Sequence, residues 1–267
     1  MSTSTRRRSR RIALPVGVAA VAFVLAGCAA GGTDAAETPD ADVAQDVVFA
    51  LKEDIVCVDP QQTSLTTSLN VGRQLVDSLI DQDPETGELV PWLAESWEAS
   101  DDLTSYTFTL GEGITFSDGT PLTSEVVAAN FDAVANLGAG ASLAKGYLAG
   151  YTGTDVTSDT EFTVNFSAPN VAFQQGASTM TLGIVSAETV AATPEERCQP
   201  IVGTGPFVLD SYTHTDSVVI SARDVYDWAS SLRGHEGDAD LDTVPFPLIT
   251  ETSVRTGGRA PGESHVL

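Results

Sequence analysis

Residues 105–125 read SYTFTLGEGITFSDGTPLTSE and hold the clearest fold signals in the chain. Ser105–Leu110 alternates Tyr, Phe and Leu with small polar residues, which predicts a half-buried strand. Ile114–Phe116 alternates again, and Asp118-Gly119 is a strong signal for a tight turn. Thr123 can cap the free N–H groups of a helix that begins after it. The stretch therefore predicts strand, turn and helix in close succession.

The same rules predict further elements on either side of this stretch. We expect a buried strand at 47–51, a helix at 68–80, a hairpin at 156–166 that turns at Ser158-Asp159, and strands at 207–209 and 217–221. Helices and strands are interspersed and no internal repeat appears. This order predicts a mixed α/β (α+β) fold.

The chain is strongly acidic. Of its 267 residues, 37 are Asp or Glu and 13 are Lys or Arg. All the acidic residues follow position 33, and five of the basic ones lie within the first eleven positions. The part that follows Cys28 carries eight basic and 37 acidic residues, a net charge of −29. Such a body repels nucleic acid and anionic lipid, so we expect no nucleic-acid partner.

The N-terminus is typical of an export signal. A cationic start is followed by the apolar stretch Ile12–Ala26, which is too short for a comfortable membrane span. It ends in Leu25-Ala26-Gly27-Cys28, which resembles a bacterial lipobox. We expect residues 1–27 to be a lipoprotein signal peptide and Cys28 to carry the lipid anchor.

These features predict an exported protein held at the outer face of the cytoplasmic membrane, periplasmic or on the cell surface. Ser9-Arg10-Arg11 leaves general secretion and twin-arginine export both open. Residues 28–45 are rich in Ala, Gly, Thr and acidic residues without an apolar period, and we expect a disordered tether there. Cys57 and Cys198 remain in the exported part, where they could form a disulfide or stay as two buried thiols.

Gly203-Thr204-Gly205 is the motif that could hold a phosphate. Val208 stands where a dinucleotide fingerprint has its third glycine, and no Lys-Ser or Lys-Thr pair follows. The next residues are strand-like, so no helix N-terminus is available for a phosphate. We expect no nucleotide cofactor and interpret the glycines as a tight turn.

No other motif predicts catalysis. Asp238-x-Asp240-x-Asp242 begins like a calcium loop, but Thr243 and Ile249 stand where that loop needs Gly and Glu. The sequence has no Gly-x-Ser-x-Gly motif, and its three histidines lack metal-ligand spacing. We expect no catalytic residue, no metal site and no cofactor, and therefore no enzyme.

Several separate blocks, in order, resemble the extracytoplasmic solute-binding proteins of ABC importers, family 5, which bind oligopeptides, dipeptides or nickel. The matching blocks are Leu75–Leu79, Thr86–Pro91, Leu93–Trp97, Tyr106–Leu110, Gly113–Phe116, Asp118–Leu122, Ile201–Phe207 and Tyr226–Trp228 with Leu241-Asp242 after it. The resemblance extends over residues 46–267. Gly111 departs from it, since the family has a basic residue there.

The resemblance implies a type II periplasmic-binding-protein fold. Residues 46–80 and 202–267 would form an incomplete lobe I, and residues 81–201 an inserted, smaller lobe II. Members of the family are longer and have a third lobe that supplies most charged ligand contacts. That lobe is missing here, and we expect a C-terminally truncated product.

The resemblance also implies a function and a site. The chain would be a monomer that binds peptides or a similar small solute and delivers them to ABC permease subunits in the membrane. Cys57 and Cys198 would come close enough for a disulfide, and the ligand contacts would lie in one segment: Gln61, Gln62, Thr63, Ser64 and Ser68. A structural surface lipoprotein or non-functional fragment is the main alternative, and a hydrolase on a similar shell is a weaker one.

Overall fold

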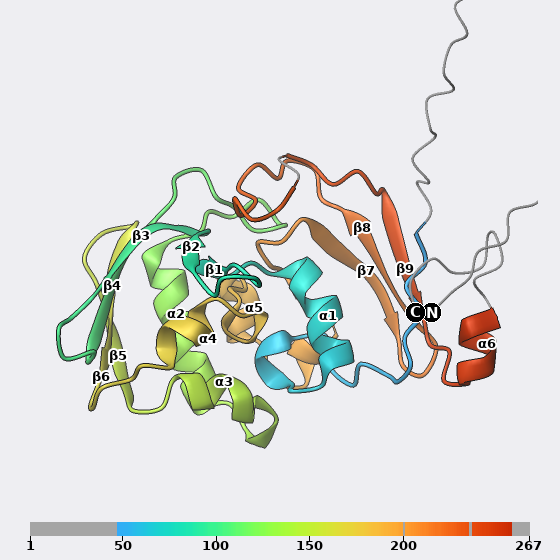
Figure 1. Cartoon of the computed structure of the whole chain (residues 1–267), viewed down its shortest axis with the longest axis horizontal. Coiled ribbons are helices and arrows are strands. Elements are labelled where there is room, and N and C mark those ends of the chain that lie inside the picture. Colours follow the sequence, from blue (N-terminus) through green and yellow to red (C-terminus); the bar gives the residue numbers. More distant parts are fainter. Residues whose placement is uncertain (1–46, 200, 235–236, 258–267) are drawn as a thin grey trace, which may run out of the picture. The chain divides into compact units, whose positions relative to one another are not determined.

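A computed structural model describes residues 47–199, 201–234 and 237–257, with side chains placed up to residue 254 (Figure 1). These residues belong to one compact unit, Val43–Leu267. The expected signal peptide, the expected tether and Cys28, the expected lipidation site, lie outside the described residues.

The described elements mix short helices with antiparallel strands. The α-helices are α1 (Thr66–Leu75), α2 (Ser124–Asn136), α3 (Ser142–Tyr147), α4 (Phe173–Ala177), α5 (Ala187–Ala191) and α6 (Thr252–Gly257), and the 3-10 turns are η1 (Pro60–Gln62), η2 (Ala139–Ala141), η3 (Met180–Leu182) and η4 (Glu196–Cys198). The strands are β1 (Ile80–Gln82), β2 (Leu89–Pro91), β3 (Ala94–Ala99), β4 (Ser105–Leu110), β5 (Tyr151–Val156), β6 (Glu161–Phe166), β7 (Phe207–Thr213), β8 (Ser217–Ala222) and β9 (Thr243–Pro247). The mixed α/β class is confirmed.

A four-stranded antiparallel sheet, in the order β3-β4-β6-β5, forms around the stretch that opened the sequence analysis. Phe108 of β4 pairs with Phe162 of β6, and their rings stack with centroids 5.4 Å apart. Phe173 of α4 packs edge-on against Phe108. The alternation at 105–110 is thus confirmed as a half-buried strand. The hairpin expected at 156–166 is confirmed in its second strand, but its start is wrong, because its first strand runs over Tyr151–Val156. The expected cap is confirmed too, since Thr123 accepts a hydrogen bond from the Val126 N–H at the start of α2.

A three-stranded antiparallel sheet, β7-β8-β9, contains both strands expected after residue 206. The expected strand at 47–51 is wrong as a regular strand, because this segment makes only isolated bridges along the outer edge of β9. Pro245 and Pro247 have no N–H, so they pair through their carbonyls, which accept from Phe49 and Leu51.

The helix expected at 68–80 is wrong at its end, because α1 stops at Leu75. Val76 takes an extended conformation, with φ of −134° and ψ of 146°, and β1 begins at Ile80. The chain therefore leaves the helix just where it passes the glycines of the 203–205 segment.

Buried apolar side chains form two clusters. One lies among residues 79–184 and is centred on the four-stranded sheet and α2. The other joins residues 51–76 to Val185 and to residues 201–246 around the three-stranded sheet. Each cluster thus gathers segments that are close in the fold, and the second brings together both ends of the described chain.

Among the described residues, no single helix is long and apolar enough to cross a membrane. One bent pair, Ser124–Asn136 with Ala139–Tyr147, passes the length and composition test, but its two parts meet at 109°.

Candidate solute-binding site

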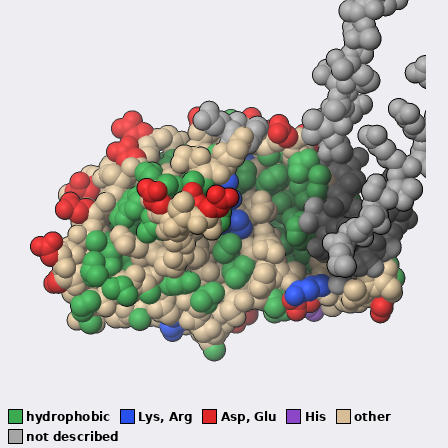
Figure 2. Space-filling view, in the orientation of Figure 1, with side chains coloured by type: hydrophobic (Ala, Val, Ile, Leu, Met, Phe, Trp, Pro, Cys, Tyr) green, Lys and Arg blue, Asp and Glu red, His purple; other side chains and the backbone are tan. Residues whose placement is uncertain are grey.

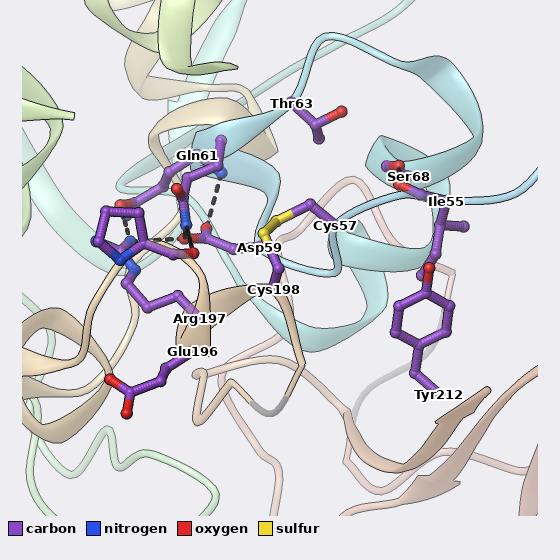
Figure 3. The surroundings of a disulfide bond; sticks show 12 residues. Ile55, Cys57, Asp59, Gln61, Thr63, Ser68, Glu196, Arg197, Cys198 and Tyr212 are labelled. Atoms are coloured by element: carbon purple, nitrogen blue, oxygen red, sulfur yellow. Dashed lines mark hydrogen bonds and ion pairs between the residues drawn. A yellow bond between two sulfur atoms is a disulfide. The ribbon is translucent and has the colours of Figure 1, made fainter. Parts of the chain in front are cut away.

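A disulfide lies beside the segment in which ligand contacts are expected. Cys57, just before η1, is bonded to Cys198 at the end of η4, with an S–S distance of 2.00 Å (Figure 3). The next buried contact is an ion pair, Arg197 Nη2 to Asp59 Oδ2 at 2.8 Å, in which both side chains are almost fully buried. Two segments 141 residues apart in sequence are joined here by a covalent and an ionic contact.

Gln61 is enclosed in this cluster. Its side-chain amide donates to Asn130 Oδ1 at 2.8 Å and to the Gly183 carbonyl at 2.7 Å. Its carbonyl oxygen accepts from Arg197 Nη2 at 2.6 Å (Figure 3). Gln61 is 1% exposed. Every polar atom of its side chain thus has a partner within the chain.

The other four expected ligand residues divide between interior and surface. Ser68 is buried and its hydroxyl donates to the Ile55 carbonyl. Thr63 is buried and its hydroxyl oxygen accepts from the Leu65 N–H. The Gln62 side chain donates to Asp59 and to the Pro194 carbonyl. Ser64 is exposed. A role of these residues as solute contacts stays a prediction, and the described cavities have other linings.

Gly203 and Gly205 pack against the C-terminal end of α1. A Cβ added at Gly203 would lie 2.0 Å from the Leu75 carbonyl oxygen, and one at Gly205 would lie 2.6 Å from the Gln74 carbonyl oxygen. The chain bends at 204–206, but neither glycine has a positive φ. Close approach of two backbones, rather than a left-handed turn, therefore requires glycine here.

Asp77 is buried where residues 203–205, here called the crossing segment, pass the C-terminal end of α1. Trp228 Nε1 donates to Asp77 Oδ2 at 3.1 Å, and the Tyr226 hydroxyl donates to Oδ1 at 3.4 Å. The Asp77 N–H donates to Thr204 Oγ1 at 2.9 Å. Burial raises the pKa of Asp77 to about 7, against the lowering effect of the nearby Arg73. Asp77, just after α1, thereby contacts residues 203–205 through its backbone N–H and the chain after β8 through its carboxyl group.

Arg223 supports this arrangement from the other side. Its guanidinium lies over the Trp228 ring, 4.9 Å from the centroid. It donates to the Phe116 carbonyl and to Thr115 Oγ1, each at 2.6 Å. The indole of Trp228 is thus fixed between a cation and the carboxylate of Asp77.

Two further guanidinium groups lie over the ring of Trp92. The Arg73 guanidinium carbon lies 5.0 Å from the centroid of the Trp92 ring and that of Arg233 lies 5.2 Å away, both within cation–π range. Arg233 Nη2 also lies 3.2 Å from Asp81 Oδ2. Burial lowers the pKa of Arg73 to about 10, and the charge of Arg233 adds to this lowering.

These groups line a cavity of about 350 Å³. Its lining combines charged and aromatic side chains with apolar ones: Arg73, Gln74, Asp77, Trp92, Pro206, Phe207, Tyr226, Ala229, Arg233, Gly237, Ala239, Asp240 and Leu241. Figure 2 shows basic side chains near the middle of the displayed face, between areas of hydrophobic side chains. A few polar groups within a mostly apolar lining are typical of small-molecule sites.

A second cavity of about 410 Å³ shares Arg73, Gln74, Phe207 and Leu241 with the first. Its other lining residues are mostly apolar and come from the N-terminal segment, α1, η3 and the three-stranded sheet: Val47, Phe49, Asn70, Met180, Ile220, Val244 and Phe246. The two cavities therefore adjoin each other.

Sequence reasoning missed this site. Arg73, Trp92 and Arg233 are far apart in the chain, and no spacing rule links them. One signal in the sequence could have pointed to this site. Basic residues are scarce in this acidic chain, so each arginine that follows Cys28 is a candidate for a specific contact. Among the described residues, no group of three or more metal-ligating side chains occurs.

The fold and the sequence can now be compared with known proteins. Residues 88–266 match the model of bacterial extracellular solute-binding proteins, family 5. The glutathione-binding protein GsiB of Escherichia coli K12 is 28% identical over 223 residues, which is 83% of this chain and 41% of that protein. The chain thus spans about two fifths of the length of the curated relatives it matches.

Solved structures show the same fold. A nickel ABC transporter protein from Bacillus halodurans aligns with a TM-score of 0.67 and 22% identity, over 82% of this chain and 42% of that one. A dipeptide-binding protein from Pseudoalteromonas sp. SM9913, in complex with Met-Leu, gives a TM-score of 0.65 and 22% identity, over 79% and 45% of the two chains. The architecture is that of a type II periplasmic binding protein. The chain belongs to the bacterial extracellular solute-binding proteins, family 5.

Proposed function

We propose that this protein binds a small solute outside the cytoplasm and delivers it to an ABC-type importer. The observation that carries the proposal is the family match over residues 88–266, two thirds of the chain. The cavity beside Trp92 supports it, since its volume lies within the range of small-molecule sites. The described relatives are binding proteins rather than enzymes.

We propose a peptide as the solute. GsiB is named for glutathione, itself a tripeptide, and the Pseudoalteromonas neighbour holds Met-Leu. A cavity of about 350 Å³ suits a solute of this size. Nickel is the competing solute, because a nickel transporter protein is among the structural neighbours.

We also propose how the chain is exported, attached to the membrane and divided into lobes. Residues 1–27 would direct export, Cys28 would hold the protein to the membrane, and residues 28–45 would act as a tether. Residues 46–80 with 202–267 would form lobe I and residues 81–201 lobe II. Two separate apolar clusters support two lobes, but the clusters change over between Val76 and Leu79 and between Ile184 and Val185. Solute capture would shift the protein toward a closed conformation that the permease recognises, with no bond made or broken.

A thermal-shift screen of the purified chain tests the proposal. The panel would hold dipeptides, tripeptides, glutathione and nickel with and without a chelator. We expect peptides to raise the melting temperature in a concentration-dependent way, because a ligand that binds only the folded state stabilises it. A shift with nickel alone would replace peptide by metal, and no shift with any compound would contradict solute binding.

A further inference from the structure

Two of the few basic side chains of this acidic chain line the cavity, and a third lies just behind it. Within the described part, the Lys and Arg side chains are six: Lys52, Arg73, Lys145, Arg197, Arg223 and Arg233. Arg73 and Arg233 line the cavity, and Arg223 holds Trp228 just behind it. The cavity therefore holds two of the four arginines whose side chains the structure describes.

The aromatic groups of the cavity do not favour a cationic solute. Trp92 and Tyr226 line the cavity and could in principle hold an ammonium group. Trp92, however, already has the guanidinium groups of Arg73 and Arg233 within 5.2 Å of its centroid. The carboxyl groups of Asp77 and Asp240 also line the cavity. At the Trp92 ring itself, a cation would meet the two guanidinium groups, whereas an anion would reduce their mutual repulsion.

The guanidinium groups of Arg73 and Arg233 differ in the number of contacts that they make with the rest of the chain. Arg73 donates to Ser78 Oγ at 2.9 Å and to the Ser178 carbonyl at 3.1 Å, so it is a fixed part of the wall. Arg233 has a side chain 50% exposed, and among the described residues its guanidinium makes one ion pair, with Asp81. That contact lacks the geometry of a hydrogen bond, because Asp81 Oδ2 is buried without a hydrogen-bond partner in the described structure. The guanidinium donors of Arg233 that do not face Asp81 are therefore available to a solute while the ion pair stays in place.

The rest of the lining is suited to an apolar group. Pro206, Phe207 and Leu241 are apolar residues of the lining. Phe207 and Leu241 also line the second cavity, which continues to Ile220 and Phe246. A solute whose anionic end lies at Arg233 would meet apolar surface in this direction.

From these contacts we propose that the cavity binds the carboxylate of a small solute through Arg233, with Arg73 and Trp92 as the fixed wall and an apolar group of the solute on Phe207 and Leu241. The inference rests on the proposed function in that it names the solute's chemical class and its site. A planar guanidinium recognises a carboxylate by two parallel hydrogen bonds. The carboxylate could belong to a peptide C-terminus or to a non-peptide acid.

The test is calorimetric titration of the chain with three matched probes: the dipeptide Ala-Leu, its C-terminal amide, and N-acetyl-leucine. The first and third have a free carboxylate, and the amide has none. Each probe is titrated into the unchanged chain and into Arg233→Gln, Arg233→Lys and Lys52→Gln. The last variant loses the same charge at an exposed site outside the cavity, where Lys52 pairs with its neighbour Glu53.

We expect the free-carboxylate probes to bind and the amide to bind at least about tenfold more weakly, because a lost charge-assisted hydrogen bond has about this effect. Arg233→Gln should weaken the carboxylate probes by a similar factor, Arg233→Lys should restore part of the affinity, and Lys52→Gln should leave it unchanged. Since Arg233 is half exposed, these variants are expected to fold, which their melting curves check.

Two failures can be told apart. If Ala-Leu and its amide bind equally and Arg233→Gln changes neither, the carboxylate site is wrong while peptide binding stands. If N-acetyl-leucine alone binds and depends on Arg233, the carboxylate site stands while peptide is the wrong solute. Absence of saturable binding by every probe would overturn the inference.

Discussion

Gly203 lies so close to Leu75 that an added Cβ would be 2.0 Å from the Leu75 carbonyl oxygen. This contact holds the crossing segment against the end of α1, and the Gly203 carbonyl also accepts from the Ser117 N–H at 2.9 Å. Because both sides of the contact are backbone, neither can move as a side chain could. The geometry of the cavity wall at Arg73 and Asp77 depends on this approach.

Gly203→Ala should therefore lower the free energy of unfolding by at least about 3 kcal/mol, as overpacking against backbone does. Urea unfolding measures the change. Gly138→Ala is the matched control, because no atom lies within 4 Å of its added Cβ, and we expect less than about 1 kcal/mol there. Equal, small effects at both positions would show that the close approach is wrong.

The disulfide should stabilise the chain through its long loop. Cys57 and Cys198 are separated by 141 residues, so the chain-entropy model gives a contribution on the order of 4–5 kcal/mol. The double variant Cys57→Ala/Cys198→Ala should unfold at a correspondingly lower urea concentration, and a reductant should have no further effect on it. Detection of both residues as free thiols in the untreated, exported protein by peptide mass spectrometry would refute the pairing.

Asp77 should make stability depend on pH. Burial raises its pKa from 3.8 to about 7, so between these values the folded chain keeps a proton that the unfolded chain releases. The contribution of Asp77 is thus fully present below about pH 4 and is lost as the pH rises toward 7, by on the order of 4 kcal/mol at most.

The comparison with Asp77→Asn isolates this effect. The amide oxygen can still accept from Trp228, but the side chain does not titrate. We expect the stability of the unchanged chain relative to the variant, measured by urea unfolding, to fall between pH 4 and pH 7.5. A pH-independent difference would show that Asp77 keeps its ordinary pKa.

Val225 should be a site of backbone strain. It has a φ of 64° and is 69% exposed, in the short connection that leads from Arg223 to Tyr226. A β-branched residue is unfavourable in this conformation, while Asn tolerates it. Val225→Asn should raise the free energy of unfolding by about 1 kcal/mol. Val171→Asn, at an equally exposed valine without a positive φ, should not, and a gain at both sites would point to surface hydrophobicity instead.

Local patterns in the sequence predicted the elements whose residues are adjacent in the chain. The alternation at 105–110 and the hairpin at 156–166 depend on neighbours in sequence, and so does the Thr123 cap. The segment 47–51 could not be predicted in the same way, because its pairing depends on Pro245 and Pro247, almost two hundred residues away. The end of α1 likewise depends on Gly203, which sequence periodicity at 68–80 does not register.

The candidate site was less predictable than the fold. The family resemblance pointed to Gln61 and Ser68, two polar side chains that the structure gives partners inside the chain. The cavity is built instead from Arg73, Trp92 and Arg233, which only the folded chain brings together. The scarcity of basic residues could have drawn attention to the two arginines. It could not have shown that both guanidinium groups lie over the ring of Trp92.

The most direct measurement is a calorimetric titration of the purified chain with the peptide that gives the largest thermal shift. We expect saturable binding with a stoichiometry of one peptide per chain and a micromolar or tighter dissociation constant. The absence of saturable heat with any peptide at millimolar concentration, from a chain that still unfolds cooperatively, would contradict a peptide-binding function.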